Sequence, residues 1–214
     1  MKVLVACEYS GVVRDAFIAK GHEAISCDLL PTDKPGLHYQ GDVFDIINER
    51  WDLMIAHPPC TYLTCSAEWA YSDGPYHQKL SDSTLTGKDR VAAREEAIKF
   101  VLRLYDANIP RVAIENPIGV LSSRWRKPDQ IIQPYEYGDD ASKKTCLWLR
   151  GLPKLKPTGL YPPRLAQSGK GYVFRWGNQT DGGQNKEPPS ADRWKVRSQT
   201  WQGWANAMVD QWGQ

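Results

Sequence analysis

An apolar run, Asp52-Leu-Met-Ile-Ala56, stops abruptly before two consecutive prolines, and a cysteine, Cys60, follows at once. Pro58 and Pro59 cannot donate the ladder hydrogen bonds of a β-sheet, so a strand that includes this run must end before them. Open α/β sheets place ligands and reacting groups at the carboxyl ends of their strands. The segment therefore favours a nucleophilic thiol at Cys60. The alternative is that this cysteine is a small buried hydrophobe.

Short apolar strands and amphipathic helices alternate along the first 150 residues. This alternation is typical of α/β proteins, in which right-handed crossovers produce a parallel, doubly wound sheet. We therefore predict such a sheet. The expected strands are residues 2–7, 23–27, 51–56, 111–114, 131–135 and 145–149, and the expected helices are residues 12–19, 88–107 and 201–212.

Two segments lack a clear apolar period. Residues 66–90 are polar, and a loop of that length inside a compact domain is usually functional, so we expect a mobile lid over the site that includes Cys60. Residues 151–190 are rich in proline, glycine and basic side chains, which favours an irregular appendage over a second full domain. The expected organisation is a catalytic domain at residues 1–150, a small basic appendage at 151–192 and a C-terminal helix at 193–214 that packs back on the catalytic domain.

Cysteine and histidine usage argues against several kinds of site. The five cysteines are odd in number and contain no CxxC pair, and the four histidines form no ligand pattern with them, so we expect neither a disulfide framework nor a metal site. No signal peptide precedes the first strand, and no apolar run approaches the roughly 18–20 residues that a membrane span needs. We expect a soluble protein of a reducing cytoplasm without a membrane partner.

The net charge of +2 makes the chain no general polycation, so contacts with a nucleic acid must come from local basic patches. The chain has nine tryptophans and ten tyrosines, and its aromatic residues as a group are dense in the last third. Such rings can stack on nucleobases, and they can equally fill a small irregular core.

Three reactive or acidic side chains, Asp28, Cys60 and Glu115, follow the ends of expected strands and should line one rim of the sheet. Asp28, about 20 residues after the first turn, is suited to bind a ribose hydroxyl, and Asp42 could accept from an adenine amino group. A solvated turn is the alternative for each aspartate. Only Gly11 stands where a dinucleotide fold has G-x-G-x-x-G. This argues against a nicotinamide or flavin dinucleotide and favours a cofactor without phosphates, such as S-adenosylmethionine.

The segment Glu115-Asn116-Pro117 is a second polar motif fixed by proline at a strand end. The carboxyl group of Glu115 could hydrogen-bond the amino group and ring nitrogen of a pyrimidine if it is protonated or shares a proton. An alternative, compatible with that role, is a helix N-cap at Asn116 with Pro117 at the first helical position.

Together these motifs resemble those of the DNA cytosine-C5 methyltransferases, in a short form similar to phage and prophage members. Pro58-Pro59-Cys60 resembles the nucleophile motif of the family, and Glu115-Asn116-Pro117 resembles its Glu-Asn-Val motif. The segment Cys7-Glu-Tyr-Ser-Gly-Val-Val-Arg14 occupies the place of the glycine-rich first motif but keeps a single glycine. The resemblance extends from residue 3 to about residue 149 and, weakly, over the last twenty residues.

Two late motifs of the family are matched less completely. Arg197-Ser-Gln-Thr200 and Gly203-Trp-Ala-Asn206 resemble the motif that completes the cofactor pocket. The Gln-x-Arg-x-Arg strand is not matched, and Lys144 is the candidate substitute for its basic residue.

The resemblance implies a Rossmann-like, S-adenosylmethionine-dependent methyltransferase sheet with a small irregular basic appendage. It implies that Cys60, as a thiolate with a lowered pKa, attacks C6 of a cytosine flipped out of double-stranded DNA, after which C5 accepts a methyl group. Glu115 would hold the base edge. The catalytic residues implied are Cys60, Glu115 and Lys144, and the cofactor contacts implied are Cys7, Tyr9, Ser10, Gly11, Asp28, Asp42, Val43 and Pro58.

The basic residues of the appendage and its borders would contact DNA phosphates and give short or relaxed sequence recognition. A phage origin would place such DNA modification, or a restriction–modification role, in the cytoplasm of a bacterial host. The candidate DNA contacts are Lys143, Arg164, Arg175 and Arg197, with Lys170, Lys186, Arg193 and Lys195 as further basic residues.

Three alternatives stay open at this point. A relative that uses carboxy-S-adenosylmethionine and transfers a carboxymethyl group would have nearly the same sequence. A DNA-binding relative without activity is disfavoured by the intact Cys60 and Glu115. An enzyme that acts on free pyrimidine nucleotides would need a closed, phosphate-sized pocket.

Overall fold

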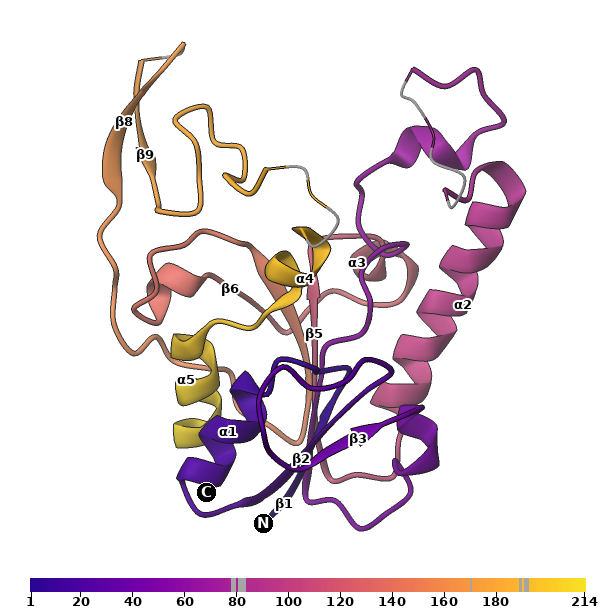
Figure 1. Cartoon of the computed structure of the whole chain (residues 1–214), viewed down its shortest axis with the longest axis vertical. Coiled ribbons are helices and arrows are strands. Elements are labelled where there is room, and N and C mark those ends of the chain that lie inside the picture. Colours follow the sequence, from indigo (N-terminus) through magenta and orange to yellow (C-terminus); the bar gives the residue numbers. More distant parts are fainter. Residues whose placement is uncertain (78–79, 81–83, 170, 189, 191–192) are drawn as a thin grey trace.

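The computed structural model describes residues 1–77, 80, 84–169, 171–188, 190 and 193–214. Figure 1 shows a central sheet with helices on both sides and a separate hairpin at the upper left. The sheet has seven strands in the order β3-β2-β1-β4-β5-β7-β6, and the hairpin is β8-β9. The predicted α/β class, with a mostly parallel, Rossmann-like sheet, is confirmed.

The first five strands of the sheet pair in parallel, and β7 lies antiparallel between β5 and β6. The strands are β1 (Lys2–Ala6), β2 (Glu23–Asp28), β3 (His38–Gln40), β4 (Leu53–Ala56), β5 (Arg111–Pro117), β6 (Gln130–Ile132), β7 (Thr145–Arg150), β8 (Arg164–Ser168) and β9 (Gly171–Arg175). The α-helices are α1 (Val12–Ala19), α2 (Gly87–Tyr105), α3 (Leu121–Arg124), α4 (Arg193–Ser198) and α5 (Gln202–Trp212), and the 3₁₀ turns are η1 (Val43–Asp45), η2 (Glu68–Tyr71) and η3 (Pro134–Glu136).

Side chains of the central strands alternate between two buried layers, as the period of two along a strand requires. On β1, Val3 and Val5 join the layer that includes residues of α1 and α5, whereas Leu4 and Ala6 join the layer that includes residues of α2. Both faces of the sheet are therefore covered, which explains why its strands are apolar throughout and not alternating in hydropathy.

Several elements differ from the expectation. The edge strand β3 is not among the expected strands, and β6 is shorter than residues 131–135. The segment 151–190 is not wholly irregular because it contains the β8-β9 hairpin. Residues 66–90 contain η2, and the lid predicted for them includes residues 78–79 and 81–83, which lie outside the described part of the chain.

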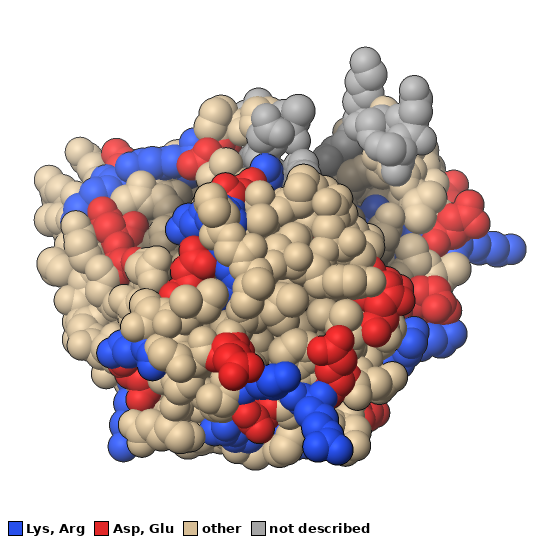
Figure 2. Space-filling view, turned by 60° about the horizontal axis from the view of Figure 1, so that its bottom comes forward, with Lys and Arg blue, Asp and Glu red and all other residues tan. Residues whose placement is uncertain are grey.

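The parallel strands all end at the upper edge of the sheet in Figure 1. Figure 2 brings the opposite end forward, and there basic and acidic side chains are interspersed without a single-sign patch. The described helices include none that is both long and apolar enough to cross a membrane. The rim at the carboxyl ends of the strands is therefore the place to look for the predicted site.

Candidate active site

The two proline-containing motifs meet at the ends of β4 and β5. These strands pair in parallel, with Ala56 opposite Ile114, so the residues that follow them emerge side by side. The Nδ1 atom of His57 lies 2.9 Å from Oε2 of Glu115, and Nδ2 of Asn116 donates to the carbonyl oxygen of Pro58 at 2.8 Å. Two side-chain hydrogen bonds thus fasten one motif to the other.

The helix N-cap considered for Asn116 is wrong, because this residue belongs to β5 and α3 begins only at Leu121. A strand conformation directs its amide towards the loop of Pro58 and makes it a brace between the motifs.

Cys60 stands at the start of a tight turn directly after the prolines. Its carbonyl oxygen accepts from the backbone N–H groups of Leu63 at 3.0 Å and Thr64 at 3.1 Å. This turn is pressed against the chain after β5. An ideal Cβ at Gly119 would lie 2.0 Å from the carbonyl oxygen of Leu63, so only glycine allows the approach.

The chain after this turn is anchored to α2. Nε of Arg94 donates to the carbonyl oxygen of Tyr62 at 2.9 Å, and its Nη2 atom forms an ion pair of 2.7 Å with Glu68. The guanidinium carbon of Arg94 also lies 3.5 Å from the ring centroid of Tyr71, a cation–π arrangement. These contacts fasten the turn after Cys60 and η2 to helix α2.

The electrostatic surroundings of Cys60 differ from the expectation of a lowered pKa. Burial raises the pKa of the thiol above its ordinary value, and the positive charge of Lys143 opposes this rise. The carboxylate of Glu115 adds to the rise, whereas Arg197 opposes it. At neutral pH the Cys60 thiol is therefore mostly protonated. The positive charges of Lys143 and Arg197 reduce the free-energy cost of ionising it.

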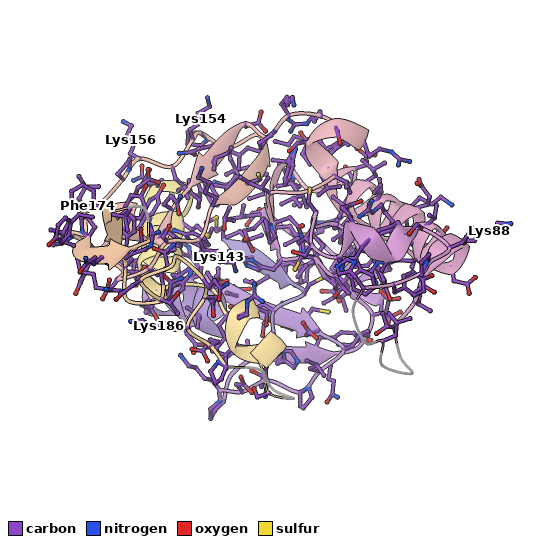
Figure 3. All side chains as sticks on the ribbon, turned by 90° about the horizontal axis from the view of Figure 1, so that it is seen from above. Lys88, Lys143, Lys154, Lys156, Phe174 and Lys186 are labelled. Carbon is purple, nitrogen blue, oxygen red and sulfur yellow. The ribbon has the colours of Figure 1, made fainter. Side chains whose placement is uncertain are left out.

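Lys143, and not its neighbour Lys144, brings its charge to the site. The Nζ atom of Lys143 donates to the carbonyl oxygen of Arg197 at 3.1 Å, which holds the ammonium group near Cys60. Lys144 is exposed. Figure 3 places Lys143 near the middle of the upper face.

We expect the Lys143→Gln variant to need a higher pH for thiolate formation at Cys60. Removing the cation leaves burial and Glu115 less opposed, so the pKa of the thiol should rise and the rate of its alkylation at a given pH should fall. The midpoint of the alkylation rate against pH should move upward by about 1 pH unit. Iodoacetamide labelling at a series of pH values, with the Cys60 peptide quantified by mass spectrometry, measures this. The matched control is Lys144→Gln, and equal profiles for the two variants would contradict the assignment.

Glu115 is almost completely buried, with its side chain 11% exposed. Burial acts to raise the pKa of the carboxyl group, but the hydrogen bond with His57 and the charge of Lys143 bring the pKa below its ordinary value. The carboxyl group is therefore ionised at neutral pH, so any proton that Glu115 offers a pyrimidine has to be supplied or shared by a neighbour.

The turn after β1 is organised by a buried carboxylate. Glu8 accepts from the backbone N–H of Val13 at 2.7 Å and of Arg14 at 3.3 Å, so it occupies the amino end of α1. Ser10 donates to the same carboxylate at 3.2 Å. Gly11 has a φ of 71° and faces the Arg14 guanidinium so closely that a Cβ there would lie 2.4 Å from Nη2.

The predicted cofactor residues gather beside this turn. The charges of Asp28 and Asp42 both reach Cys7, whose thiol pKa is raised first by burial and then by these carboxylates. Asp28 is half-buried, and burial raises the pKa of its carboxyl group. Asp42 is exposed and caps η1 through a 2.9 Å hydrogen bond from the backbone N–H of Phe44. Two further predicted contacts, Val43 and Pro58, are buried.

Helix α4 contacts both sides of the rim. Tyr9 donates its hydroxyl to the carbonyl oxygen of Lys195 at 2.5 Å and lies 2.9 Å from Oγ of Ser198. The Nζ atom of Lys195 pairs with Asp33 at 2.8 Å. Because Lys143 also donates to Arg197, this short helix joins the turn after β1 to the site around Cys60.

Two of the predicted DNA contacts are engaged inside the appendage. Arg164 forms a 2.6 Å ion pair with Asp181, and Nε of Arg175 donates to the carbonyl oxygen of Asp181 at 3.2 Å. Of the other basic residues considered, Lys170 and the side chain of Arg193 lie outside the part that the structure describes.

The sequence analysis missed three residues of the site: Glu8, His57 and Asn116 in its bracing role. His57 directly follows the last residue of β4, Glu8 lies two residues after the end of β1, and Asn116 lies one residue before the end of β5, so position at the sheet rim is the pattern that could have found them. Within the described ranges, no group of three or more His, Cys, Asp or Glu side chains is arranged to hold a metal ion.

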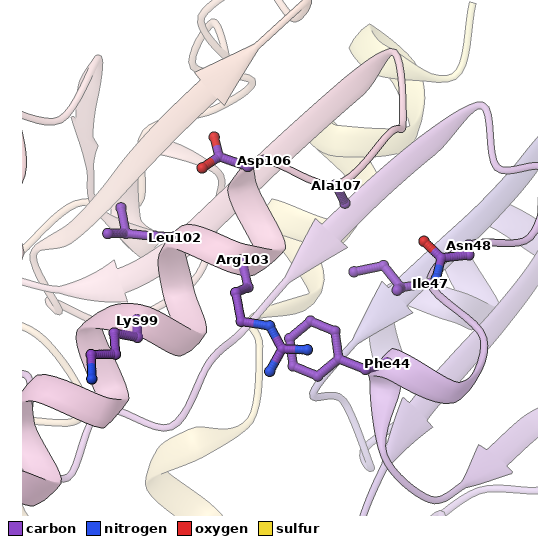
Figure 4. A pocket seen from close by; sticks show the side chains of 8 residues that line it. All are labelled: Phe44, Ile47, Asn48, Lys99, Leu102, Arg103, Asp106 and Ala107. Carbon is purple, nitrogen blue, oxygen red and sulfur yellow. The ribbon is translucent and has the colours of Figure 1, made fainter.

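A groove of about 640 Å³ lies elsewhere, between η1 and the carboxyl-terminal half of α2 (Figure 4). Phe44, Arg103 and Asp106 are among the residues that line it, and none of the candidate catalytic residues does. The polar side chains that meet at the strand ends, and not the volume of a cavity, therefore identify the candidate site.

No known protein-family profile matches the sequence, and no curated protein matches it. Two solved structures are similar in fold. One, named as a DNA modification methyltransferase encoded within a prophage of E. coli, has a TM-score of 0.46 at 13% identity over 76% of this chain and 52% of that chain. A mutant of Spodoptera frugiperda DNMT2 has a TM-score of 0.39 at 16% identity over 70% of this chain and 49% of that chain. This chain spans about half the length of each, and the similarity extends no further than the fold.

Proposed function

We propose that this protein transfers a methyl group from S-adenosylmethionine to C5 of cytosine in DNA. The observation that carries the proposal is the junction of the two motifs, in which His57-Glu115 and Pro58-Asn116 hydrogen bonds join the loop of Cys60 to the end of β5. A nucleophilic thiol and a buried carboxylate at one rim are the two groups that covalent activation of a pyrimidine needs.

In the proposed reaction, the thiolate of Cys60 adds to C6 of the flipped-out base, and the C5–C6 π electrons become available at C5. S-adenosylmethionine, when held by Asp28 and Asp42, would supply the methyl group as an electrophile, with its sulfonium C–S bond broken as the C5–CH₃ bond is made. A base or water then removes the C5 proton, and the pair of electrons released expels Cys60 as a thiolate. Glu115 holds the N3 and amino edge of the base, where charge changes when Cys60 adds.

The residues of the first turn fit a cofactor that has no phosphates. The carboxylate of Glu8 accepts from the N–H groups of Val13 and Arg14 at the start of α1, where dinucleotide-binding folds hold a pyrophosphate. A phosphate there would meet a negative charge and find these donors already used. Asp28, half-buried at the end of β2, is the proposed partner of the ribose hydroxyl groups, and Asp42 is the proposed partner of the adenine amino group.

We propose that the segment 151–192 contacts DNA while residues 1–150 and 193–214 form the catalytic unit. Residues 151–190 contain six Lys or Arg residues and two Asp or Glu residues, a local basic excess. One face of the β8-β9 hairpin presents Leu165, Tyr172 and Phe174, which are 62%, 74% and 64% exposed. Exposed rings beside basic residues suit stacking on nucleobases.

We expect the double variant Tyr172→Ala, Phe174→Ala to bind DNA about tenfold more weakly or worse, because base–aromatic stacking is lost. Fluorescence anisotropy with single-stranded and duplex oligonucleotides measures the affinity. Ile18→Ala, which removes an exposed apolar side chain from α1, is the matched control. An unchanged affinity would remove the hairpin from the DNA-binding surface.

One observation favours a second cofactor. The cation Lys143 lies within electrostatic reach of Cys60, where the transferred group must arrive, and it could attract the carboxylate of carboxy-S-adenosylmethionine. The product would then be 5-carboxymethylcytosine. The buried Arg14 is a poor candidate for this role, because its donors bind Asp15, Ser26, Thr32 and two backbone carbonyls.

The test is incubation of the purified protein with unmodified DNA and each cofactor, followed by mass spectrometry of the nucleosides. We expect 5-methylcytosine; 5-carboxymethylcytosine from the carboxylated cofactor alone would select the second candidate. Duplex DNA should be modified more readily than free cytidine nucleotides. Unmodified cytosine in every reaction, with DNA binding intact, would identify a DNA-binding relative without activity.

A further inference from the structure

The hydrogen bond between His57 and Glu115 involves one of the two polar side-chain atoms of each residue. His57 Nδ1 and Glu115 Oε2 are 2.9 Å apart, and the two side chains are 8% and 11% exposed. In the described part of the chain, the other two polar atoms, Nε2 of His57 and Oε1 of Glu115, are buried without a hydrogen-bond partner. Buried polar atoms left unpaired are unfavourable, so a pair of them beside a thiol indicates a place made for a polar ligand.

The chemistry of the pair fixes the role of each atom. The pKa of Glu115 is lowered in part by this hydrogen bond, so its carboxylate accepts, and Nδ1 of His57 must carry the hydrogen. With Oε2 bound in this way, Oε1 is the oxygen left for a substrate. A carboxylate that is held at one oxygen cannot rotate freely about its terminal bond, so its second oxygen points in one direction.

The inference rests on the proposed function and adds a residue to it. We propose that His57 is a positioning residue that holds Glu115 by Oε2 and directs Oε1 at the hydrogen-bonding edge of the target pyrimidine. The sequence places His57 directly before the two prolines, which fix the backbone that carries it. The backbone N–H of His57 donates to the carbonyl oxygen of Ala6 at 2.9 Å. The imidazole is therefore carried by backbone that is hydrogen-bonded to β1.

No basic residue of β7 takes over this task. The β7 residue opposite Glu115 is Leu147, an apolar side chain. The charged or titratable groups whose electrostatic influence involves Glu115 are His57 directly after β4, Lys143 from the turn before β7, Cys60 from the turn after β4 and Cys146 on β7. Arg197 of α4 acts on Cys60. Of these groups, only His57 is hydrogen-bonded to the carboxylate in the described structure.

Two amide variants separate this role from a merely structural one. In His57→Asn, the side-chain amide nitrogen stands near the position of Nδ1 and can donate to Glu115. In His57→Gln, the same amide group is one methylene further out and stands near the position of Nε2. The variants share polarity and donor type, so they differ mainly in whether the bond to Oε2 can form. His22→Asn, in the turn between α1 and β2, controls for the loss of an imidazole.

Single-turnover methyl transfer to DNA is measured from pH 6 to pH 9 for each variant. We expect His57→Asn to react about 10- to 100-fold faster than His57→Gln, the range for one hydrogen bond to a charged group. His22→Asn should equal the natural protein. Equal rates for the two His57 variants, or a faster Gln variant, would overturn the proposal.

A second measurement does not depend on activity. Carboxyl ¹³C NMR of glutamate-labelled protein reports the titration of Glu115, and its pKa should rise in His57→Gln but stay lowered in His57→Asn. The same pKa in both variants would overturn the role of His57. If the NMR result is as expected while the natural protein modifies no DNA, the positioning of Glu115 stands and the proposed substrate is wrong.

Discussion

The Cys60→Ser variant is expected to lose methyl transfer by a factor on the order of 10⁴ or more, as when a covalent nucleophile is removed. A serine hydroxyl has nearly the size of the thiol, but it ionises far less readily. Transfer of a labelled methyl group to DNA measures the rate. With DNA that contains 5-fluorocytosine, the natural protein should form an adduct stable to denaturation, because fluorine blocks the elimination step, and the variant should form none.

The matched control for this prediction is Cys65→Ser. Cys65 is an exposed free thiol five residues further along the same segment, so it tests whether any nearby cysteine can take part. Its variant should transfer methyl groups and form the adduct at the rate of the natural protein. An adduct in Cys60→Ser that maps to Cys65 would move the nucleophile to that residue.

The second large effect is expected for Glu115→Gln, with a loss of about 10²- to 10⁴-fold in the chemical step, the range for general acid–base catalysis. The amide has the size of the carboxyl group and can still hydrogen-bond a cytosine edge, but it cannot share or transfer the proton that N3 needs as Cys60 adds. DNA affinity should therefore stay near its natural value while the single-turnover rate falls. Anisotropy and rapid-quench measurements separate the two.

Glu96→Gln serves as the control for Glu115→Gln. Glu96 lies on the surface of α2 and pairs with Lys99, away from the candidate site. A natural rate for Glu115→Gln would mean that the buried carboxylate has a structural role only, because the amide preserves its shape.

The parts of the fold that sequence predicted best are those in which one physical cause dominates. Prolines at positions 58 and 59 had to end a strand, and Lys88 to Ala107 had the apolar spacing of a helix, observed as α2. The edge strand β3 escaped because its three residues are only partly buried and have no apolar pattern. The β8-β9 hairpin was not predicted because its large apolar side chains, Leu165, Tyr172 and Phe174, face solvent, so hydropathy does not follow burial there.

The position of the candidate site at the rim of the sheet could be predicted from the sequence, but the contacts between its residues could not. Of the three residues expected after strand ends, Asp28 is the last residue of β2, Glu115 lies two residues before the end of β5 and Cys60 lies four residues after the end of β4. The bond between His57 and Glu115 joins residues 58 positions apart, and it depends on the register of β4 with β5, which no local pattern encodes. The choice between Lys143 and Lys144 depends on which of two adjacent side chains points to the rim, a matter of one residue of register.

The contacts of helix α4 bear on the order in which the parts of this protein fold. Its backbone carbonyls accept hydrogen bonds from Tyr9 in the turn after β1 and from Lys143 in the turn before β7, so both halves of the rim are bridged by a segment that follows all seven strands of the sheet in the sequence. Chains emerge and fold from their amino end, and a nascent chain with the whole seven-stranded sheet still lacks this bridge. The rim should therefore be completed in a single step, when residues 193–198 pack against Tyr9 and Lys143, and not gradually as the sheet forms.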